Sequence, residues 1–333
     1  MWNFSSAIEL TRQQEAEIET IVKNRLAEGS DFPLSQTPTW AKMIERLGVP
    51  VHLIYSLERQ AVAVLYESAP GILECTNGPV LDWRTTVSAM ESLTEFAQQA
   101  RKLHLKAPLH ALKVSPRFFV QDIEDVLSDF PLSPSRIDQA STIWVSLDGD
   151  PASLYRSLKA RLRRSIVRAS KQPVRFEWRP ARPENLDCFA EGMSHFGVKK
   201  NIFAPPREWY EPATLSREPY FFVARAIFVA PPEGTPAEAE TQLLFACMGD
   251  TAHYLLGWEL RSDAVPTPLS TSAFCHWQSM LRLQALGYLR YDLNGYVKDP
   301  PLDHPYRGVA EFKSQFGGEI VTYGSPEFTI KNE

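Results

Sequence analysis

Three strand-like runs open the clearest structural unit of the chain, VHLIYSLERQAVAVLYESAPGILECTNGPVL (51–81). Apolar and β-branched residues dominate these runs, and the Asn77-Gly78 pair is typical of a tight turn. TTVSAMESLTEFAQQARKL (85–103) then has the apolar spacing of an amphipathic helix, and APLHALKVSP (107–116) has the pattern of a buried strand that ends at Pro116. This order of strands, helix and strand predicts a mixed α/β unit.

A similar order returns in the second half of the chain, although no sequence repeat is visible. The predicted elements are strands at 220–230, 241–250 and 252–260, a helix at 270–287 and a strand at 289–296. We therefore predict two domains of one fold in tandem, at 1–150 and 151–333, with a C-terminal segment that can pack back on the first. A Pro/Glu/Ala-rich insert at 230–240 predicts an exposed hairpin loop.

The bulk composition is that of an ordinary globular protein, with 333 residues, 44% hydrophobic and 23% charged. The net charge of -5 excludes a polyanion-binding molecule as a whole, so any contact with nucleic acid needs a local basic patch. Four separate cysteines without a Cys-x-x-Cys pair argue against a zinc cluster or other metal site and against a disulfide framework, and they fit a reducing compartment. We expect a cytoplasmic protein, because the N-terminus lacks the apolar run of a signal peptide and no segment is apolar enough to insert in a membrane.

A basic patch of the required kind lies in a predicted helix at 151–171. Its Lys and Arg residues fall close together: Arg156, Lys159, Arg161, Arg163, Arg164, Arg168 and Lys171. Such a run is often only a solvated helix face. In an acidic protein it is equally consistent with binding to the phosphates of tRNA or of another substrate, for which Arg161, Arg164, Arg168 and Lys171 are the candidates.

Familiar catalytic motifs are missing from the sequence. It contains no G-x-S-x-G, H-E-x-x-H, P-loop or G-x-G-x-x-G motif, and its histidines are scattered singly. The polar residues gather instead in the C-terminal third, where LRYDLNGY (289–296) ends in a loop. Lys313 follows Phe312 on a short predicted helix at 307–316, and it is either a solvated surface residue or a catalytic cation.

Three motifs of this third occur in order: Gly287-Tyr288, Tyr291-Asp292-Leu293-Asn294-Gly295 and Phe312-Lys313-Ser314-Gln315-Phe316-Gly317-Gly318-Glu319. Together they resemble the C-terminal signature of the Fem-type aminoacyltransferases. SQTPTWAKMIERLG (35–48) and the basic segment at 153–174 are similar to two further elements of that family. The resemblance implies tandem GNAT-like (acyl-CoA N-acyltransferase) domains, in the compact form without a coiled-coil arm. It also implies transfer of an amino acid from aminoacyl-tRNA to the amine of a muramyl-peptide precursor, without a cofactor.

The resemblance further implies roles for single residues. Lys313 would be the catalytic cation, and Phe312 would shield it from water. Residues that would bind the acceptor are Lys42, Arg207, Tyr210 and Tyr254, and Phe312 is a further substrate-binding candidate. One departure from the family pattern is Ser115-Pro116, where an acidic residue often precedes the proline, so the group that deprotonates the amine is left open.

Three alternatives remain at this point. An acetyl-CoA-type N-acyltransferase would need a phosphate loop, and the two candidates, Gln284-x-x-Gly287 and Gln315-x-x-Gly318, are broken by Leu289 and Ile320. A tRNA-dependent aminoacyltransferase could instead act on a small-molecule amine or a peptide in natural-product biosynthesis. The third alternative is a non-catalytic binding module on the same fold.

Overall fold

A computed structural model places most of the chain. It describes residues 2–7, 9–29, 32–81, 83, 86–103, 105, 107–128, 130, 132–228, 239–262 and 269–331. The predicted hairpin insert at 230–240 lies almost wholly outside the described residues, which resume at Ala239. The chain divides into two compact units, unit 1 with residues 1–140 and 322–333, and unit 2 with residues 141–321.

Unit 1 is a mixed sheet covered by helices. Its elements are β1 (Asn3–Ser6), α1 (Arg12–Ala27), α2 (Pro38–Glu45), β2 (Val51–Ser56), β3 (Ala61–Ala69), β4 (Ile72–Thr76), α3 (Thr86–Ala100), β5 (Ala111–Ser115), β6 (Phe118–Phe119) and α4 (Ile123–Ser128). Strands β1 to β4 pair antiparallel in chain order, and β4 and β5 run parallel. Helix α3 makes the crossover between β4 and β5, as a parallel pair requires. It packs Leu93 and Phe96 into the core of this unit.

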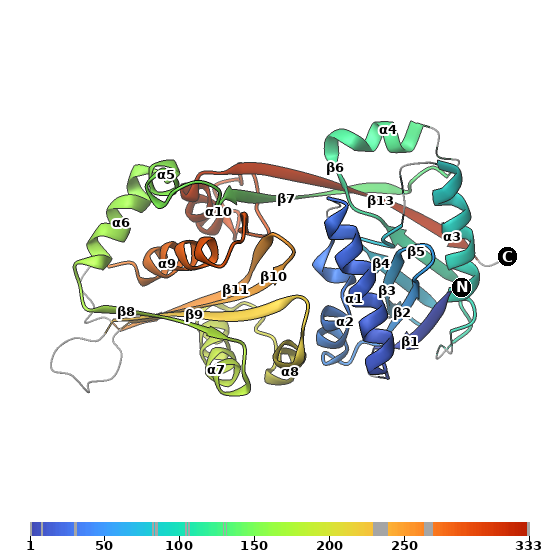
Figure 1. Ribbon diagram of the computed structural model, residues 1–333, viewed down its shortest axis with the longest axis horizontal. Coiled ribbons are helices and arrows are strands. Elements are labelled where there is room, and N and C mark those ends of the chain that lie inside the picture. The colour runs from blue at the N-terminus through green and yellow to red at the C-terminus, as the bar shows by residue number, and fades with distance from the viewer. Residues whose placement is uncertain are drawn as a thin grey trace. The chain divides into compact units, whose positions relative to one another are not determined.

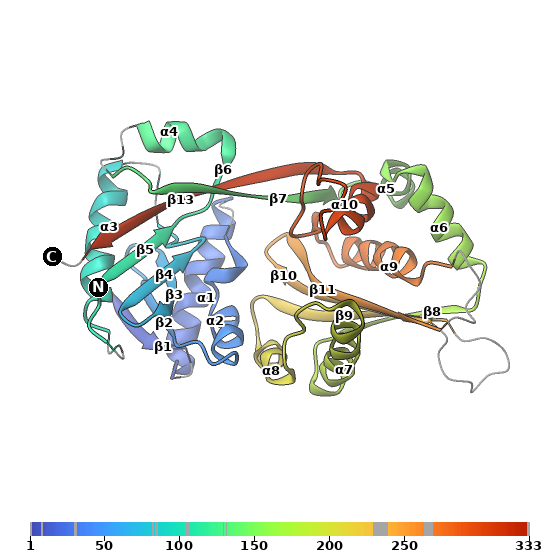
Figure 2. The same ribbon diagram turned by 180° about the vertical axis from the view of Figure 1, so that it is seen from behind.

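Unit 2 repeats this order of strands and helices. They are α5 (Pro151–Ser157), α6 (Ala160–Ser170), β8 (Val174–Pro180), α7 (Pro183–Lys200), α8 (Arg207–Leu215), β9 (Tyr220–Phe228), β10 (Ala239–Met248), β11 (Thr251–Arg261), α9 (Thr271–Ala285), β12 (Arg290–Asp292) and α10 (Arg307–Lys313). Strands β8 to β11 pair antiparallel in chain order, and α9 leads from β11 to its parallel partner β12. Helices α6 and α9 cover one face of the sheet and α7 and α8 the other (Figures 1 and 2).

The last strand of each sheet comes from the other half of the sequence. Strand β7 (Arg136–Ser146) follows the first copy along the chain, yet its residues 144–146 pair with β12 of unit 2. Strand β13 (Glu319–Lys331) follows the second copy, and its residues 328–331 pair with β5 of unit 1. The observed boundary therefore falls at Ala140/Ser141 and not at 150/151, because β7 contributes its second half to the core of unit 2.

The predicted basic helix at 151–171 is two helices. Leu158 and Lys159 are extended, with ψ of 144° and 148°, and they separate α5 from α6. The guanidinium of Arg163 holds this break by donating to the carbonyl oxygens of Arg156 at 2.9 Å and Leu158 at 2.6 Å. Arg163 is therefore a structural residue, which a count of positive charges in the sequence does not reveal.

Candidate functional site

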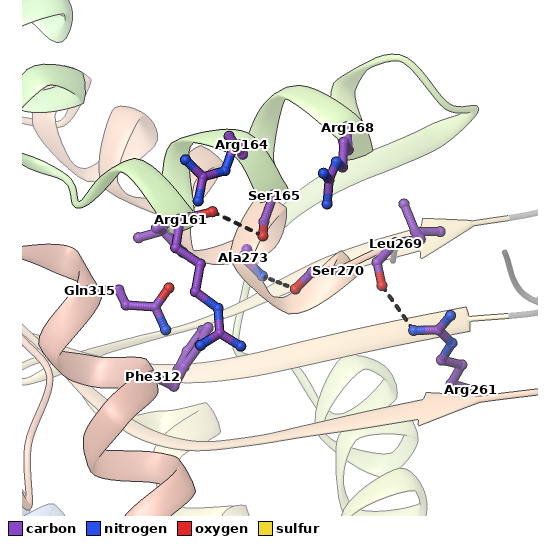
Figure 3. A pocket seen from close by; sticks show the side chains of 11 residues that line it. Arg161, Arg164, Ser165, Arg168, Arg261, Leu269, Ser270, Ala273, Phe312 and Gln315 are labelled. Atoms are coloured by element: carbon purple, nitrogen blue, oxygen red, sulfur yellow. Dashed lines mark hydrogen bonds between the residues drawn. The ribbon is translucent and has the colours of Figure 1, made fainter. Parts of the chain in front are cut away.

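A pocket of about 520 Å³ opens in unit 2 between α6, the start of α9, the end of β11 and the segment around α10. Arginine is its most frequent lining residue, with Arg161, Arg164 and Arg168 from α6 and Arg261 from β11. Phe312 and Gln315 line the opposite wall. Figure 3 shows Arg161 reaching from α6 toward these two residues. The pocket is therefore strongly cationic and has an aromatic ring in one wall.

The sequence of α6 explains why its arginines share one face. Residues 161, 164 and 168 recur at helical spacing, whereas Leu162, Ile166 and Ala169 are buried on the other side. Among the residues that the structure describes, no hydrogen bond or ion pair occupies the guanidinium groups of Arg161, Arg164 or Arg168. Like charges gathered without an acidic partner favour a polyanionic ligand.

The first turn of α9 adds to this positive potential. Ser270 caps the helix by accepting a hydrogen bond from the N–H of Ala273, and both residues line the pocket. The start of a 15-residue helix carries a partial positive charge from its aligned peptide dipoles. Arg261 donates to the carbonyl oxygen of Leu269 at 2.9 Å and so joins the end of β11 to the residue before this cap. The arrangement has the features of a phosphate-binding site.

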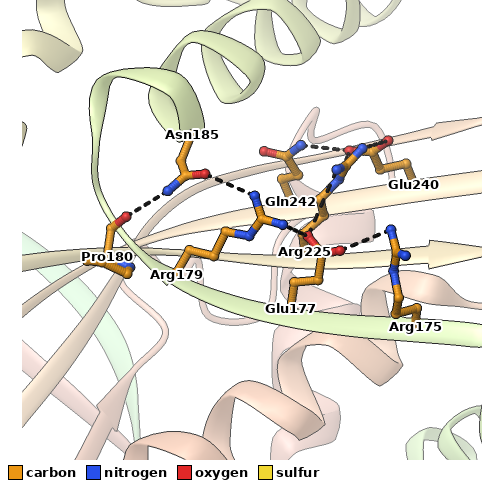
Figure 4. A network of polar contacts seen from close by, with 8 residues as sticks. All are labelled: Arg175, Glu177, Arg179, Pro180, Asn185, Arg225, Glu240 and Gln242. Atoms are coloured by element: carbon orange, nitrogen blue, oxygen red, sulfur yellow. Dashed lines mark hydrogen bonds and ion pairs between the residues drawn. The ribbon is translucent and has the colours of Figure 1, made fainter.

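A second group of arginines in unit 2 is neutralised by carboxylates. Arg225 pairs with Glu240 through two bonds of 2.6 and 2.9 Å, and Glu177 contacts Arg175 and Arg179 at 3.0 and 2.9 Å (Figure 4). This network fastens the edge strand β8 to β9 and β10. The arginines of this network therefore stabilise the sheet, whereas the arginines of α6 face the pocket.

Lys313 lies at the end of α10 and is only 9% exposed, so it is not the solvated surface residue that composition alone allowed. Its Nζ donates to the carbonyl oxygen of Asn294 and, at 2.8 Å, to that of Gly295. The ammonium also lies 5.8 Å from the ring centroid of Tyr254. Burial lowers the pKa of Lys313 to about 8, and the carboxylate of Asp292 opposes that shift. The side chain is thus a fixed cation that can lose its proton at mildly alkaline pH.

Aromatic side chains cluster beside Lys313. His276 of α9 packs its ring against Phe312 and Phe316, with centroids 5.5 and 5.1 Å apart, and against Tyr254 at 4.9 Å. Burial, together with the nearby Lys313 ammonium, lowers the pKa of His276 to about 3, so its imidazole is neutral. His276 also shares a hydrogen bond of 2.6 Å with the hydroxyl of Tyr291. A dry aromatic surrounding strengthens any electrostatic contact that Lys313 makes.

The structure groups some of the predicted site residues and separates others. Phe312, Lys313 and Tyr254 lie together, and the pocket with Arg161, Arg164 and Arg168 shares Phe312 with them. Lys171 follows α6 as its C-terminal cap and does not line the pocket.

The three remaining acceptor candidates have other contacts. Lys42 is paired with Glu15 inside unit 1. Arg207 makes a bidentate pair with Asp187, with both distances 2.6 Å. Tyr210 is only 1% exposed and packs on Phe189 and Trp209, so it is a core residue at this position. Within the described ranges of unit 2, no hydrogen bond, ion pair or ring contact joins Arg207 or Tyr210 to Lys313.

Sequence reasoning missed three parts of the site. His276 was set aside as a single histidine, and Arg261 stands alone in its strand. The start of α9 gave one usable signal, because Ser270 before an apolar helical run is a typical N-cap. In the part of the chain that the structure describes, no group of three His, Cys, Asp or Glu residues is placed to hold a metal ion. No described helix is long and apolar enough to cross a membrane.

Comparison with known proteins gives the fold its context. No known family model and no curated protein matches the sequence. Among solved structures, FemX is similar over 97% of this chain and 96% of its own, with a TM-score of 0.72 and 16% identity. L-PGS from Bacillus licheniformis has a TM-score of 0.57 and 12% identity over 93% of this chain and 91% of its own.

A third similar structure is the C-terminal domain of a putative lysylphosphatidylglycerol synthetase from Agrobacterium fabrum. It has a TM-score of 0.51 and 14% identity, and covers 94% of this chain and 92% of its own. At these identities the likeness concerns the fold. It confirms the tandem GNAT-like α/β fold and the resemblance to Fem-type enzymes at that level.

Proposed function

We propose that this protein is an aminoacyltransferase that moves an amino acid from aminoacyl-tRNA to the amine of a muramyl-peptide precursor. The observation that carries the proposal is the cationic pocket of α6 and α9, which adjoins the helix that bears Lys313. The cationic pocket suits a polyanionic donor, and Lys313 suits acyl transfer. Their common wall is Phe312, which lines the pocket and precedes the lysine.

The pocket supports an RNA donor through charge and shape. Three guanidinium groups on one helix face can contact successive phosphates of a strand, and a helix N-terminus adds backbone donors. Phe312 offers a ring on which a base can stack, as in many proteins that bind single strands. The same cationic surface could accept the diphosphate of acetyl-CoA, so the donor is the first point to test.

The transfer reaction requires little from the protein beyond the positive charge of Lys313. The acceptor nitrogen attacks the ester carbonyl carbon of the aminoacyl group, a C–N bond forms and the C–O bond to the ribose breaks. The proton lost by the amine ends on the released ribose hydroxyl. During this step the carbonyl oxygen carries negative charge, and the ammonium of Lys313 would stabilise it. No cofactor is required, because the ester is already activated.

The proposed acceptor is an amine of a muramyl peptide. FemX and L-PGS share the fold, and we take a muramyl peptide as the first candidate and a small-molecule amine or peptide as the second. We propose the cytoplasm as the location, because charged tRNA is found there and the four free cysteines suit a reducing compartment.

The test is an incubation of the full chain with labelled aminoacyl-tRNAs, one amino acid at a time, and in parallel with labelled acetyl-CoA. Each donor is offered a muramyl-pentapeptide precursor or a panel of small amines. We expect label on the muramyl peptide from one or a few tRNAs, and far slower labelling with Lys313→Met. Transfer from acetyl-CoA alone would overturn the donor, and label on small amines alone would overturn the acceptor.

A further inference from the structure

The last residue of β12 has a buried carboxylate, and both of its oxygens have hydrogen-bond partners. Asp292 is only 7% exposed. Its Oδ1 accepts hydrogen bonds from the hydroxyl of Thr142 and, at 2.8 Å, from the backbone N–H of Asn294. Its Oδ2 lies 3.0 Å from Nδ1 of His253. Burial raises the pKa of Asp292, but these hydrogen bonds outweigh it and hold the pKa below its ordinary value. The carboxylate is therefore charged and fixed in place.

The turn after Asp292 has an unusual backbone. Asn294 and Gly295 both have left-handed φ angles, 51° and 42°. Asparagine and glycine tolerate this region better than other residues do. The hydrogen bond from the Asn294 N–H to Asp292 fixes the entry to the turn, and Gly295 N–H donates to the side chain of Asn294 at 3.0 Å. As a result, the carbonyl oxygens of Asn294 and Gly295 both accept from Nζ of Lys313.

We infer that Asp292 is the positioning residue for Lys313. It fixes the turn whose two carbonyl oxygens aim the ammonium, and its negative charge stabilises that ammonium; His253 and Thr142 in turn hold the carboxylate. The inference deepens the proposed function, since it gives the source of the orientation and charge of the lysine. Asp292 itself need not touch the substrate.

The charged and titratable neighbours agree with this role. Among the described residues, the charged and titratable groups that face Lys313 are Asp292, the phenol of Tyr254 and the imidazole of His276. Of these, Asp292 is the one that carries negative charge, because His276 is neutral and burial raises the pKa of Tyr254. Burial alone favours loss of the proton from Lys313, and the Asp292 carboxylate counters it. Without that carboxylate, less of the lysine would be cationic at neutral pH.

Asp292→Asn is the decisive variant, since the amide keeps an oxygen for the Asn294 N–H and removes the negative charge. Asp250→Asn is a matched control, because Asp250 lies just before β11 and pairs with Arg290 at 2.7 Å, away from the turn. The full chain is labelled with ¹³C at the lysine ε-carbon, and the Lys313 signal is identified by its loss in Lys313→Met. Its titration midpoint is then followed between pH 6 and 11.

We expect the Lys313 midpoint to be lower in Asp292→Asn than in the wild type by more than half a pH unit, and unchanged in Asp250→Asn. An unchanged midpoint in Asp292→Asn would overturn the inference. This result does not depend on activity, so it is separate from any failure of the proposed function, which Lys313→Met tests through transfer.

If Asp292→Asn does not fold, the partly exposed His253 provides a second pair of variants. His253→Asn places an amide nitrogen where Nδ1 lies, and His253→Leu does not. We expect the Lys313 midpoint to fall in His253→Leu, because the released carboxylate can move away, and to stay near the wild-type value in His253→Asn. Equal Lys313 midpoints in these two variants would contradict the role of His253 in holding the Asp292 carboxylate.

Discussion

The ammonium of Lys313 donates a hydrogen bond of 2.8 Å to the carbonyl oxygen of Gly295. This contact joins α10 to the turn after β12, through two residues that lie 18 positions apart in the sequence. A lysine ammonium has three N–H donors, and the Asn294 and Gly295 carbonyls occupy two of them. Within the described part of the chain the third donor has no hydrogen-bond partner, and the proposed function uses it to stabilise the developing oxyanion.

The rate of transfer should depend on the charge of Lys313. Its pKa is about 8, so the side chain is cationic below that pH and loses its charge above it. We expect the single-turnover rate of the wild type to fall as the pH rises through about 8. Lys313→Arg stays cationic throughout this range and should lack the fall, whatever its absolute rate. Identical alkaline limbs in the two proteins would separate the pH dependence from Lys313.

The same ionisation affects the stability of the fold. Unfolded lysine has a pKa near 10.5, so between about pH 8 and 10.5 the unfolded chain binds more protons at this position than the folded chain. The cost of burying the charge is present below pH 8 and is removed as the pH rises. We expect the free energy of unfolding of the wild type to gain up to ~3 kcal/mol relative to Lys313→Met over this range.

Urea unfolding at pH 7.5, 9 and 10.5 measures this difference. Because tyrosines and cysteines titrate in both proteins, only the change in the gap between the two curves is informative. A gap that stays constant with pH would show that Lys313 has an ordinary pKa in the folded state.

The pocket arginines should determine the salt dependence of tRNA binding. Arg161→Gln, Arg164→Gln and Arg168→Gln each remove one charge from the pocket wall. If each contacts a phosphate, the slope of log K against log salt should fall by roughly 0.7 to 0.9 per variant. Lys171→Gln is the matched control, since it makes the same charge change just beyond α6 but outside the pocket. Filter binding between 50 and 300 mM salt gives the slopes. The same slope in all four variants would exclude the pocket as the RNA site.

Much of the fold could be predicted from the sequence, because both copies show strand-like runs followed by an amphipathic helix. The exchange of β7 and β13 between the sheets could not, since strand pairing depends on contacts far apart along the chain. The break between α5 and α6 was also missed. It depends on Arg163 bonding to the carbonyls of Arg156 and Leu158, which only the folded geometry shows.

The site was predicted in part. Phe312, Lys313 and the arginines of α6 came from motif and charge, and the structure assembles them in one unit. His276 and Arg261 carry no local signal, because a single histidine or arginine looks the same in a core, on a surface or in a site. Lys42 and Arg207 show the opposite difficulty. In the sequence each was a candidate for binding the acceptor, yet in the structure each is paired with a carboxylate.

Acid should destabilise the protein through His276. The imidazole has a pKa of about 3 in the folded state against 6.5 in a model peptide, so the unfolded chain binds the extra proton as the pH falls below 6.5. The stability contributed by the neutral imidazole is present above pH 6.5 and is lost toward pH 3, by up to about 5 kcal/mol. His276→Gln cannot take up this proton. Thermal unfolding should therefore show a shallower loss of Tm between pH 6.5 and 4.5 for the variant, and parallel losses would contradict the buried neutral imidazole.

The most direct test of the central claim is the single-turnover rate of aminoacyl transfer by Lys313→Met, compared with the wild type. The donor and acceptor are the pair that the incubation with aminoacyl-tRNAs and muramyl peptide identifies, and circular dichroism confirms the folded state of both proteins. Removing the cation that faces the oxyanion should lower the rate by about 10² to 10³, with little change in the affinity for the charged tRNA. A folded variant that transfers the amino acid at the wild-type rate would contradict the account.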